Sequence, residues 1–244
     1  MEWIYLSPHL DDIALSCGGL AWQQAQSGET VSIWTLCAGD PPPGALSPFA
    51  ESLHARWGTG REAYQQRRQE DRRSCEVLRA ECVHLALPEC IYRQKAAGKF
   101  FYDTEESLFG PLHPEEYDLV QQVAGQLGKT LKPDAHLVVP LTLGGHVDHR
   151  LTRLAAERLG RPLIYYAEYP YVLKSGQELE ELMRQGWTVA VHPVSPAGMR
   201  AWTAAVAEHA SQISTFWAGI PEMEAALQDY CQQVNGISLW QPAQ

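Results

Sequence analysis

The sequence predicts an α/β protein built around a mainly parallel sheet. Short apolar runs bounded by turn residues alternate with helical patterns along the chain, which is typical of βα units. The chain has 244 residues, 45% of them hydrophobic, and this is enough for one globular domain with a sizeable core. No internal repeat interrupts the alternation. We therefore expect one α/β domain over residues 1–244.

The expected strands and helices follow one another along the chain. Apolar runs predict strands at 3–6, 31–36, 83–87, 136–139, 163–166 and 188–192. Helical patterns predict helices at 15–27, 61–79, 115–127, 149–159, 177–185, 196–210 and 221–234. Gly28 ends the first of these helices, and Pro133 separates the third from the strand that follows.

Two long stretches, 38–60 and 88–114, lack this periodicity. The first contains the run Pro41-Pro42-Pro43-Gly44, and the second is rich in aromatic residues and turn residues. Both leave the C-terminal ends of predicted strands, where parallel α/β sheets bind their ligands. Loops of this length usually bind ligands or act as lids, and a mobile surface loop is the alternative. We expect both stretches to be substrate-binding loops.

The charge and the cysteine spacing argue against several classes of protein. The net charge of -10 disfavours binding to nucleic acid or to an anionic membrane surface. The six cysteines include no C-x-x-C pair, which leaves a thiolate zinc site or a redox dithiol without support. Met1-Glu2 leads directly into an apolar run, and no apolar stretch is long enough to span a bilayer. We expect a cytoplasmic protein.

Two polar clusters follow two of the predicted strands. The sequence Pro8-His9-Leu10-Asp11-Asp12 comes after the first strand, and a second cluster at 143–149 comes after the strand at 136–139. Because the carboxyl ends of parallel strands lie at the same edge of a sheet, we expect the two clusters to meet there. A hydrolytic zinc site needs three His or carboxylate ligands, an open position, a general base and a group that stabilises an oxyanion.

Together the clusters contain three histidines and three aspartates, which are enough for each role. Adjacent side chains cannot easily point at one spot, so we expect Asp11 and Asp12 to have different roles, one as a ligand and the other facing the attacking water. The alternative is a pair of solvated turns in which Asp12 and Asp148 cap the helices that follow them.

The two clusters resemble the motifs of the PIG-L/LmbE family of metal-dependent N-deacetylases, a GlcNAc-PI de-N-acetylase-like family. Its Pro-His-x-Asp-Asp motif is matched by residues 8–12 and its His-x-x-His motif by residues 146–149. Leu10 and Val147 stand where many members carry proline. The likeness covers about residues 1–171 and implies a Rossmann-like three-layer α/β/α sandwich.

The resemblance also implies a role for each polar residue of the two motifs. His9, Asp12 and His149 would bind Zn²⁺, with Fe²⁺ as the alternative because nitrogen and oxygen ligands accept both. Asp11 would be the base that activates water and then protonates the leaving amine. His146 would stabilise the oxyanion.

Asp148 would orient or tune that histidine, His146. Arg67, Arg68 and Arg93 are candidates for contacts with substrate, and surface salt bridges are the alternative for them. Gly18 and Gly19 do not form a dinucleotide-binding motif, and we expect them to let their helix pack closely on the sheet.

We therefore expect a zinc-dependent hydrolase that removes an acyl group, acetyl first of all, from the amide nitrogen of an amino-sugar substrate such as an N-acetylglucosamine derivative. An amidase or deacylase of a thiol-glycoside conjugate or a glycosylated secondary metabolite is the alternative within this class. The non-enzymatic alternative is a Rossmann-like module that only holds a metal. The expected partner is a small molecule, with no nucleic acid and no membrane span, and a homo-oligomer is compatible with the sequence.

Overall fold

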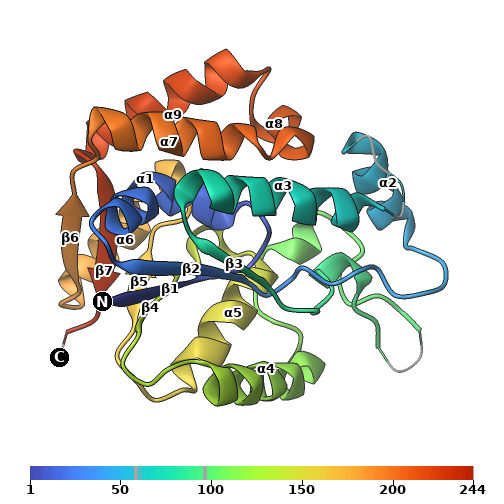
Figure 1. The fold of residues 1–244 in the computed structure, drawn as a ribbon. Helices are drawn as coiled ribbons and strands as arrows, with labels where there is room; N and C mark the ends of the chain where they lie inside the picture. Colours follow the sequence, from blue (N-terminus) through green and yellow to red (C-terminus); the bar gives the residue numbers. More distant parts are fainter. Residues whose placement is uncertain (58–59, 61, 96–97, 244) are drawn as a thin grey trace.

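A seven-stranded sheet with helices on both faces forms the part of the chain that the computed structural model describes, residues 1–57, 60, 62–95 and 98–243 (Figure 1). The strands are β1 (Glu2–Ser7), β2 (Thr30–Thr35), β3 (Glu81–His84), β4 (His136–Pro140), β5 (Ile164–Tyr166), β6 (Thr188–His192) and β7 (Ile237–Gln241). Their order is β3-β2-β1-β4-β5-β7-β6. Strands β1 to β5 pair in parallel, whereas β7 is antiparallel to β5 and β6. The predicted α/β class with a mainly parallel sheet is confirmed, and the order of β1 to β5 is that of a Rossmann-like sheet.

The helices form layers on the two faces of this sheet. They are α1 (Asp12–Gln26), α2 (Pro48–Arg56), α3 (Ala63–Leu78), α4 (Tyr117–Thr130), α5 (Val147–Glu157), α6 (Gly176–Arg184), α7 (Pro196–Ala207), α8 (Ala210–Phe216) and α9 (Ile220–Val234). Helices α1 and α3 cover one face, and α4 and α5 cover the other (Figure 1). Helix α7 packs on the outer side of α1 and α3. No described helix is long and apolar enough to cross a membrane.

The central strands are buried on both faces, which explains their continuous apolar sequences. In β1, Ile4 and Leu6 belong to the core under α4 and α5, whereas Tyr5 belongs to the core under α1. The same alternation holds in β4, where Leu137 and Val138 face opposite sides. Successive side chains of a strand point to opposite faces, so a strand between two helical layers needs apolar residues at every position.

Four elements differ from the sequence-based expectations. The expected helix 196–210 ends at Ala207, and the short helix α8 that follows it was not predicted. The third strand ends at His84, although 83–87 was expected to be extended, and α2 lies inside the expected loop 38–60. Ser47 caps α2 by accepting a hydrogen bond from the Ala50 N–H at 3.0 Å. Strand β7 follows the expected last helix and was not predicted. Parts of three expected elements lie outside the described residues. These are residues 58–59 of the first loop, 96–97 of the second loop and 61 at the start of the helix 61–79.

The two adjacent glycines of α1 face another helix, and the expectation that they pack on the sheet is wrong. A Cβ atom on Gly18 would lie 2.8 Å from Cδ1 of Trp202 in α7, and one on Gly19 would lie 3.0 Å from a methyl group of Val194. The Trp202 indole is fully buried and donates to the Ala14 carbonyl at 2.7 Å. The glycines therefore allow α7 to approach α1 closely.

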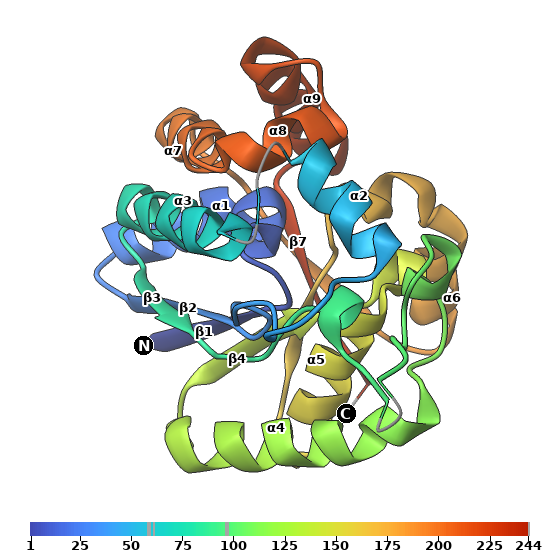
Figure 2. The ribbon, with the colours of Figure 1, turned by 90° about the vertical axis from the view of Figure 1, so that its right-hand side faces the viewer.

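Strands β1 and β4 lie side by side at the centre of the sheet, and the chain leaves them toward opposite faces. After β1 it enters α1 on one face, and after β4 it enters α5 on the other. Such a switch in direction opens a crevice beyond the carboxyl ends of the two strands. Figure 2 shows α2 next to α8 on the same side of the molecule.

Candidate metal and catalytic site

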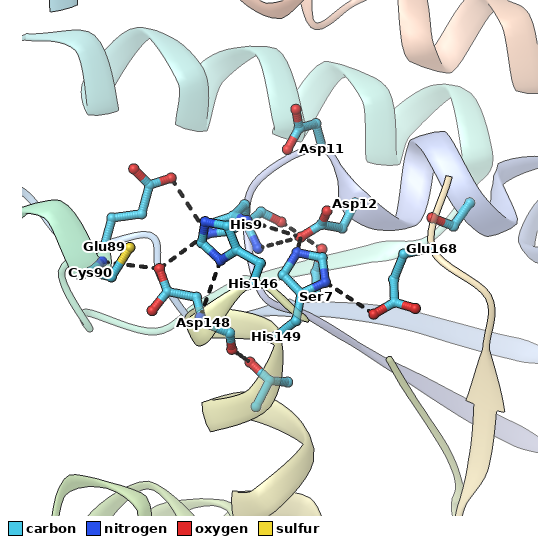
Figure 3. Close-up of polar contacts among 12 residues, drawn as sticks. Ser7, His9, Asp11, Asp12, Glu89, Cys90, His146, Asp148, His149 and Glu168 are labelled. Atoms are coloured by element: carbon cyan, nitrogen blue, oxygen red, sulfur yellow. Dashed lines mark hydrogen bonds and ion pairs between the residues drawn. The ribbon is translucent and has the colours of Figure 1, made fainter. Parts of the chain in front are cut away.

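The two polar clusters meet beyond the ends of β1 and β4 (Figure 3). His9 lies in the short turn after β1, and Asp12 is the first residue of α1. His146 precedes the first residue of α5, and His149 lies in its first turn. The ligand nitrogens of the three histidines lie within 4.8 Å of one another, close enough to share a metal ion.

Two of the histidines point one ring nitrogen at the same carboxylate oxygen. Nδ1 of His9 is 3.3 Å from Oδ2 of Asp12, and Nε2 of His149 is 3.4 Å from the same atom. In a tetrahedral site with metal–ligand distances of about 2.0–2.2 Å, neighbouring ligand atoms are about 3.4 Å apart. The spacing of these three atoms therefore fits a divalent metal such as Zn²⁺, as does their chemistry.

The other ring nitrogen of each of these histidines is held by a buried carboxylate. Nε2 of His9 is 3.1 Å from Oδ2 of Asp148, and Nδ1 of His149 is 3.1 Å from Oε1 of Glu168. A proton on each outer nitrogen leaves the inner nitrogen with a free lone pair, as a metal ligand needs. When no metal is bound and the inner nitrogens also carry protons, burial opposes ionisation of Asp12, but the neighbouring His149 and the hydrogen bonds from both histidines hold its pKa well below the usual range. A metal ion would replace those inner protons.

Asp148 is fully buried, and its charge is balanced by Arg93. Arg93 Nη1 donates to Oδ1 of Asp148, and the Cys90 N–H donates to Oδ2 at 3.0 Å. Burial opposes ionisation of Asp148, but Arg93 and His9 hold its pKa well below the ordinary value. The carboxylate thus contacts His9, while only the backbone N–H of Asp148 contacts His146.

That backbone contact determines which nitrogen of His146 can donate. Nδ1 of His146 accepts a hydrogen bond from the Asp148 N–H at 3.2 Å and caps α5. Burial and the neighbouring His9 lower the pKa of His146 well below its ordinary value, which keeps the ring neutral. A neutral ring that accepts at Nδ1 carries its proton on Nε2, so His146 has one donor available for another group.

Asp11 is buried, and its carboxylate points away from the histidines toward α3 (Figure 3). Its Oδ1 is 3.6 Å from Nη2 of Arg67, and Arg67 Nη1 also donates to Oε1 of Glu89 at 3.2 Å. Burial raises the pKa of Asp11, and the adjacent Asp12 raises it further, against the opposing effect of Arg67. Asp11 is therefore a better proton acceptor than an exposed aspartate.

The site opens into a cavity of about 370 Å³, a volume typical of small-ligand sites. His9, Asp11, Asp12 and His146 line its polar part. Its apolar part comes from both expected loops, from the segment after β5 and from α8; the aromatic lining residues are Phe49, Trp57, Phe109, Tyr169, Tyr171 and Phe216.

The three arginines expected to contact substrate occupy different places. Arg67 lines the cavity beside Asp11. Arg68 instead donates to the Ala38 carbonyl at 2.8 Å and pairs with Asp40 at 2.7 Å, which holds the start of the first loop. Arg93 is buried behind Asp148 and does not line this cavity.

Two acidic residues of the site were not singled out in the sequence. Glu168 is fully buried and accepts hydrogen bonds from the Thr142 and Leu143 N–H groups as well as facing His149. Glu89 faces Arg67 and His9. Glu168 lies two residues past the end of β5, and a carboxylate just beyond a strand end is the signal that could have found it.

Comparisons with known proteins agree with this geometry. Residues 4–159 match the PIG-L family, described as GlcNAc-PI de-N-acetylase. A 2'-N-acetylparomamine deacetylase of Niallia circulans is 29% identical over 205 residues, which cover 76% of this chain and 71% of that protein. The zinc-inhibited form of teicoplanin deacetylase Orf2 has a TM-score of 0.84 at 26% identity, covering 98% of this chain and 97% of the other.

The A40926 pseudoaglycone deacetylase Dbv21 has a TM-score of 0.72 at 25% identity, covering 98% of this chain and 95% of the other. Because the family match spans more than half of the sequence, the chain belongs to the PIG-L family of de-N-acetylases, and the prediction of an N-deacetylase is confirmed.

Proposed function

We propose that this protein is a zinc-dependent hydrolase that removes an acyl group, acetyl first of all, from the amide nitrogen of an amino sugar within a larger glycoside. The observation that carries the proposal is the convergence of His9 Nδ1 and His149 Nε2 on Oδ2 of Asp12, at 3.3 and 3.4 Å. These three residues would hold the metal. When bound, a divalent metal supplies Lewis acidity toward the amide carbonyl and the attacking water.

Two further polar residues that line the cavity move protons and stabilise charge. Asp11 takes a proton from the water whose oxygen attacks the carbonyl carbon. His146 donates its Nε2–H to the oxygen that gains negative charge. Asp11 then gives its proton to the nitrogen as the C–N bond breaks, which leaves a carboxylic acid and a free amine, and the acid releases its proton to solvent. Arg67 positions the Asp11 carboxylate from 3.6 Å away.

The relatives and the lining of the cavity both indicate the substrate class. This chain is similar to deacetylases of acetylparomamine, teicoplanin and the A40926 pseudoaglycone. The substrates of these relatives favour an amino sugar carried by a glycosylated metabolite over a thiol-glycoside conjugate. The aromatic lining from both loops suits the apolar face of such a glycoside. A cytoplasmic location and assembly into a homo-oligomer remain predictions.

Removal and return of the metal tests this proposal. Chelated and dialysed protein is titrated with one to two equivalents of Zn²⁺ or Fe²⁺, and amine release is measured on N-acetylglucosamine, 2'-N-acetylparomamine and N-acylated teicoplanin. We expect activity to vanish on chelation and to return with zinc. Excess zinc is assayed separately, because one relative is described as a zinc-inhibited form.

Two variants serve as a matched pair in that experiment. His149→Ala should lose the metal of this site and the activity, whereas His192→Ala, on β6 away from the site, should keep both. Metal that binds without amine release from any acylated amino sugar would support the non-enzymatic binding module. Full activity in the metal-free protein would overturn the proposal.

A further inference from the structure

Four potential metal ligands lie together at the outer edge of the sheet, where α3 passes over β3 (Figure 1). Asp71 and Cys75 come from α3, and Cys82 and His84 come from β3. Ligand atoms of Asp71, Cys75 and Cys82 lie within 4.8 Å of one another. None of the four residues lines the cavity of the deacetylase site.

The local spacing of the residues explains why the four side chains meet. Asp71 and Cys75 are four residues apart and therefore lie on one face of the helix. Cys82 and His84 are two residues apart and therefore lie on one face of the strand. The helix and the strand are joined by a short turn in which Arg79 adopts a left-handed conformation, with φ of 57°.

Three of the four side chains already contact one another through polar atoms. Nε2 of His84 is 2.7 Å from Oδ2 of Asp71 and 3.2 Å from Sγ of Cys82. Sγ of Cys82 is 3.4 Å from the same oxygen of Asp71. Ligand atoms bound to one tetrahedral zinc ion are about 3.3–3.8 Å apart, so small shifts would bring these atoms around one ion.

We propose that Asp71, Cys75, Cys82 and His84 form a second, structural metal site for a thiophilic divalent cation of the Zn²⁺ type. Two sulfurs, one imidazole nitrogen and one carboxylate oxygen are a donor set that selects zinc over Mg²⁺ or Ca²⁺. On binding, the two thiols release their protons to solvent and His84 binds as the neutral ring, so no electron is transferred.

The burial of the four residues suits a site that is filled from solvent and then closed. Asp71 and Cys75 are buried, whereas Cys82 and His84 are only partly buried, which leaves a route for the ion. Four protein ligands leave no open position, so this ion would have no catalytic role. It would fasten β3, the short edge strand, to α3, whose Arg67 borders the deacetylase site.

Cobalt(II) titration of the full chain separates the two sites. The site of His9, Asp12 and His149 has only nitrogen and oxygen ligands, whereas the second site would give the near-ultraviolet charge-transfer band of thiolate–cobalt bonds. We expect two equivalents of Co²⁺ per chain and one such band. The band and one equivalent should be lost in Cys82→Ser and in Cys75→Ser.

Three control variants keep the outcome unambiguous. Cys231→Ser, on α9, and Cys90→Ser, whose backbone N–H contacts Asp148, should keep the band. His149→Ala should lose one equivalent of metal but keep the band. If Cys75→Ser does not fold, the partly exposed Cys82→Ser and His84→Gln provide the same test, with one equivalent lost in the first and weakened affinity in the second.

Alkylation of Cys82 gives an independent readout. Iodoacetamide should modify this thiol in the chelated protein, and stoichiometric Zn²⁺ should protect it in His149→Ala as well as in the unchanged chain. A wild-type protein without a thiolate–cobalt band would overturn the proposal. So would a band that is lost only in Cys90→Ser, or a Cys75–Cys82 disulfide that forms in air and persists in the presence of zinc.

Discussion

Each histidine that we propose as a ligand is held at both ring nitrogens. The inner nitrogens of His9 and His149 face Asp12, and the outer nitrogens face Asp148 and Glu168. A buried carboxylate on the outer nitrogen determines the tautomer and the orientation of the ring, and it makes the inner nitrogen more basic. Glu168 does this for His149 and also accepts two backbone N–H groups after β4.

Glu168→Gln is expected to weaken metal binding by about 10- to 100-fold, because an amide cannot accept the His149 Nδ1 proton and both backbone hydrogen bonds equally well. Competition with a chromophoric chelator measures the affinity. Glu180→Gln, an exposed change of the same kind on α6, is the control and should leave the affinity unchanged. Equal affinities for the two variants would contradict the role given to Glu168.

At the scale of elements, the position of α1 depends on its contact with α7. Gly18 and Gly19 lie against Trp202 and Val194, and Asp12 is the first residue of the same helix. Helix α1 thus connects the proposed metal ligand at its N-terminus to the packing of the C-terminal helices.

Gly18→Ala is expected to lower the free energy of unfolding by about 1–3 kcal/mol, because the new methyl group would lie 2.8 Å from Cδ1 of Trp202. Gly125→Ala in α4 is the matched control. No atom lies within 4 Å of a Cβ at that position, and alanine there should raise the stability by about 0.5–1 kcal/mol. Urea denaturation measures both changes, and a Gly18→Ala protein as stable as the unchanged chain would be inconsistent with close α1–α7 packing.

The sequence predicted several strands closely, both those buried on two faces and the exposed edge strand β6, whose bounds match the expected 188–192. Strands β1, β2 and β4 have continuous apolar runs, and their observed bounds lie within about two residues of the expected ones. Helix α2 was missed because it is short and follows four turn-forming residues. Strand β7 was missed because it is short and follows Gly236, and its pairing with β5 and β6 comes from tertiary contacts that a local pattern does not contain.

At the scale of the whole molecule, the site lies beyond the ends of β1 and β4, the neighbouring strands whose connections turn to opposite faces of the sheet. The two motifs could be placed at one edge from the sequence because both follow parallel strands. The sequence could not show the contacts of three single charged residues, Glu89, Arg93 and Glu168. Each lies far along the chain from the group it touches. The cluster around Cys82 was missed for a similar reason, since its spacings of four and two residues match no zinc motif.

Acidification is expected to lower both metal retention and amine release. An imidazole binds metal only in its neutral form. Burial lowers the pKa of His9 and His149, but the surrounding carboxylates raise that of His9 well above its ordinary value and that of His149 to about 9, so protons compete with the metal as the pH falls. Both quantities should therefore rise with pH through the acidic range and then level off. A higher concentration of free metal should move this acid limb to lower pH, and a rate that stays flat down to about pH 5 would argue against histidine ligands.

We propose different roles for the two adjacent aspartates, and the most direct test measures metal content and kcat together in Asp11→Asn. The control is Asp229→Asn, an exposed change of the same kind on α9. An asparagine retains the shape of the side chain but cannot accept the proton of the attacking water. We expect one equivalent of metal to remain bound at the deacetylase site and kcat to fall by about 10²- to 10⁴-fold, while the control keeps both. An Asp11→Asn protein that retains the metal and full turnover would show that Asp11 is not the base.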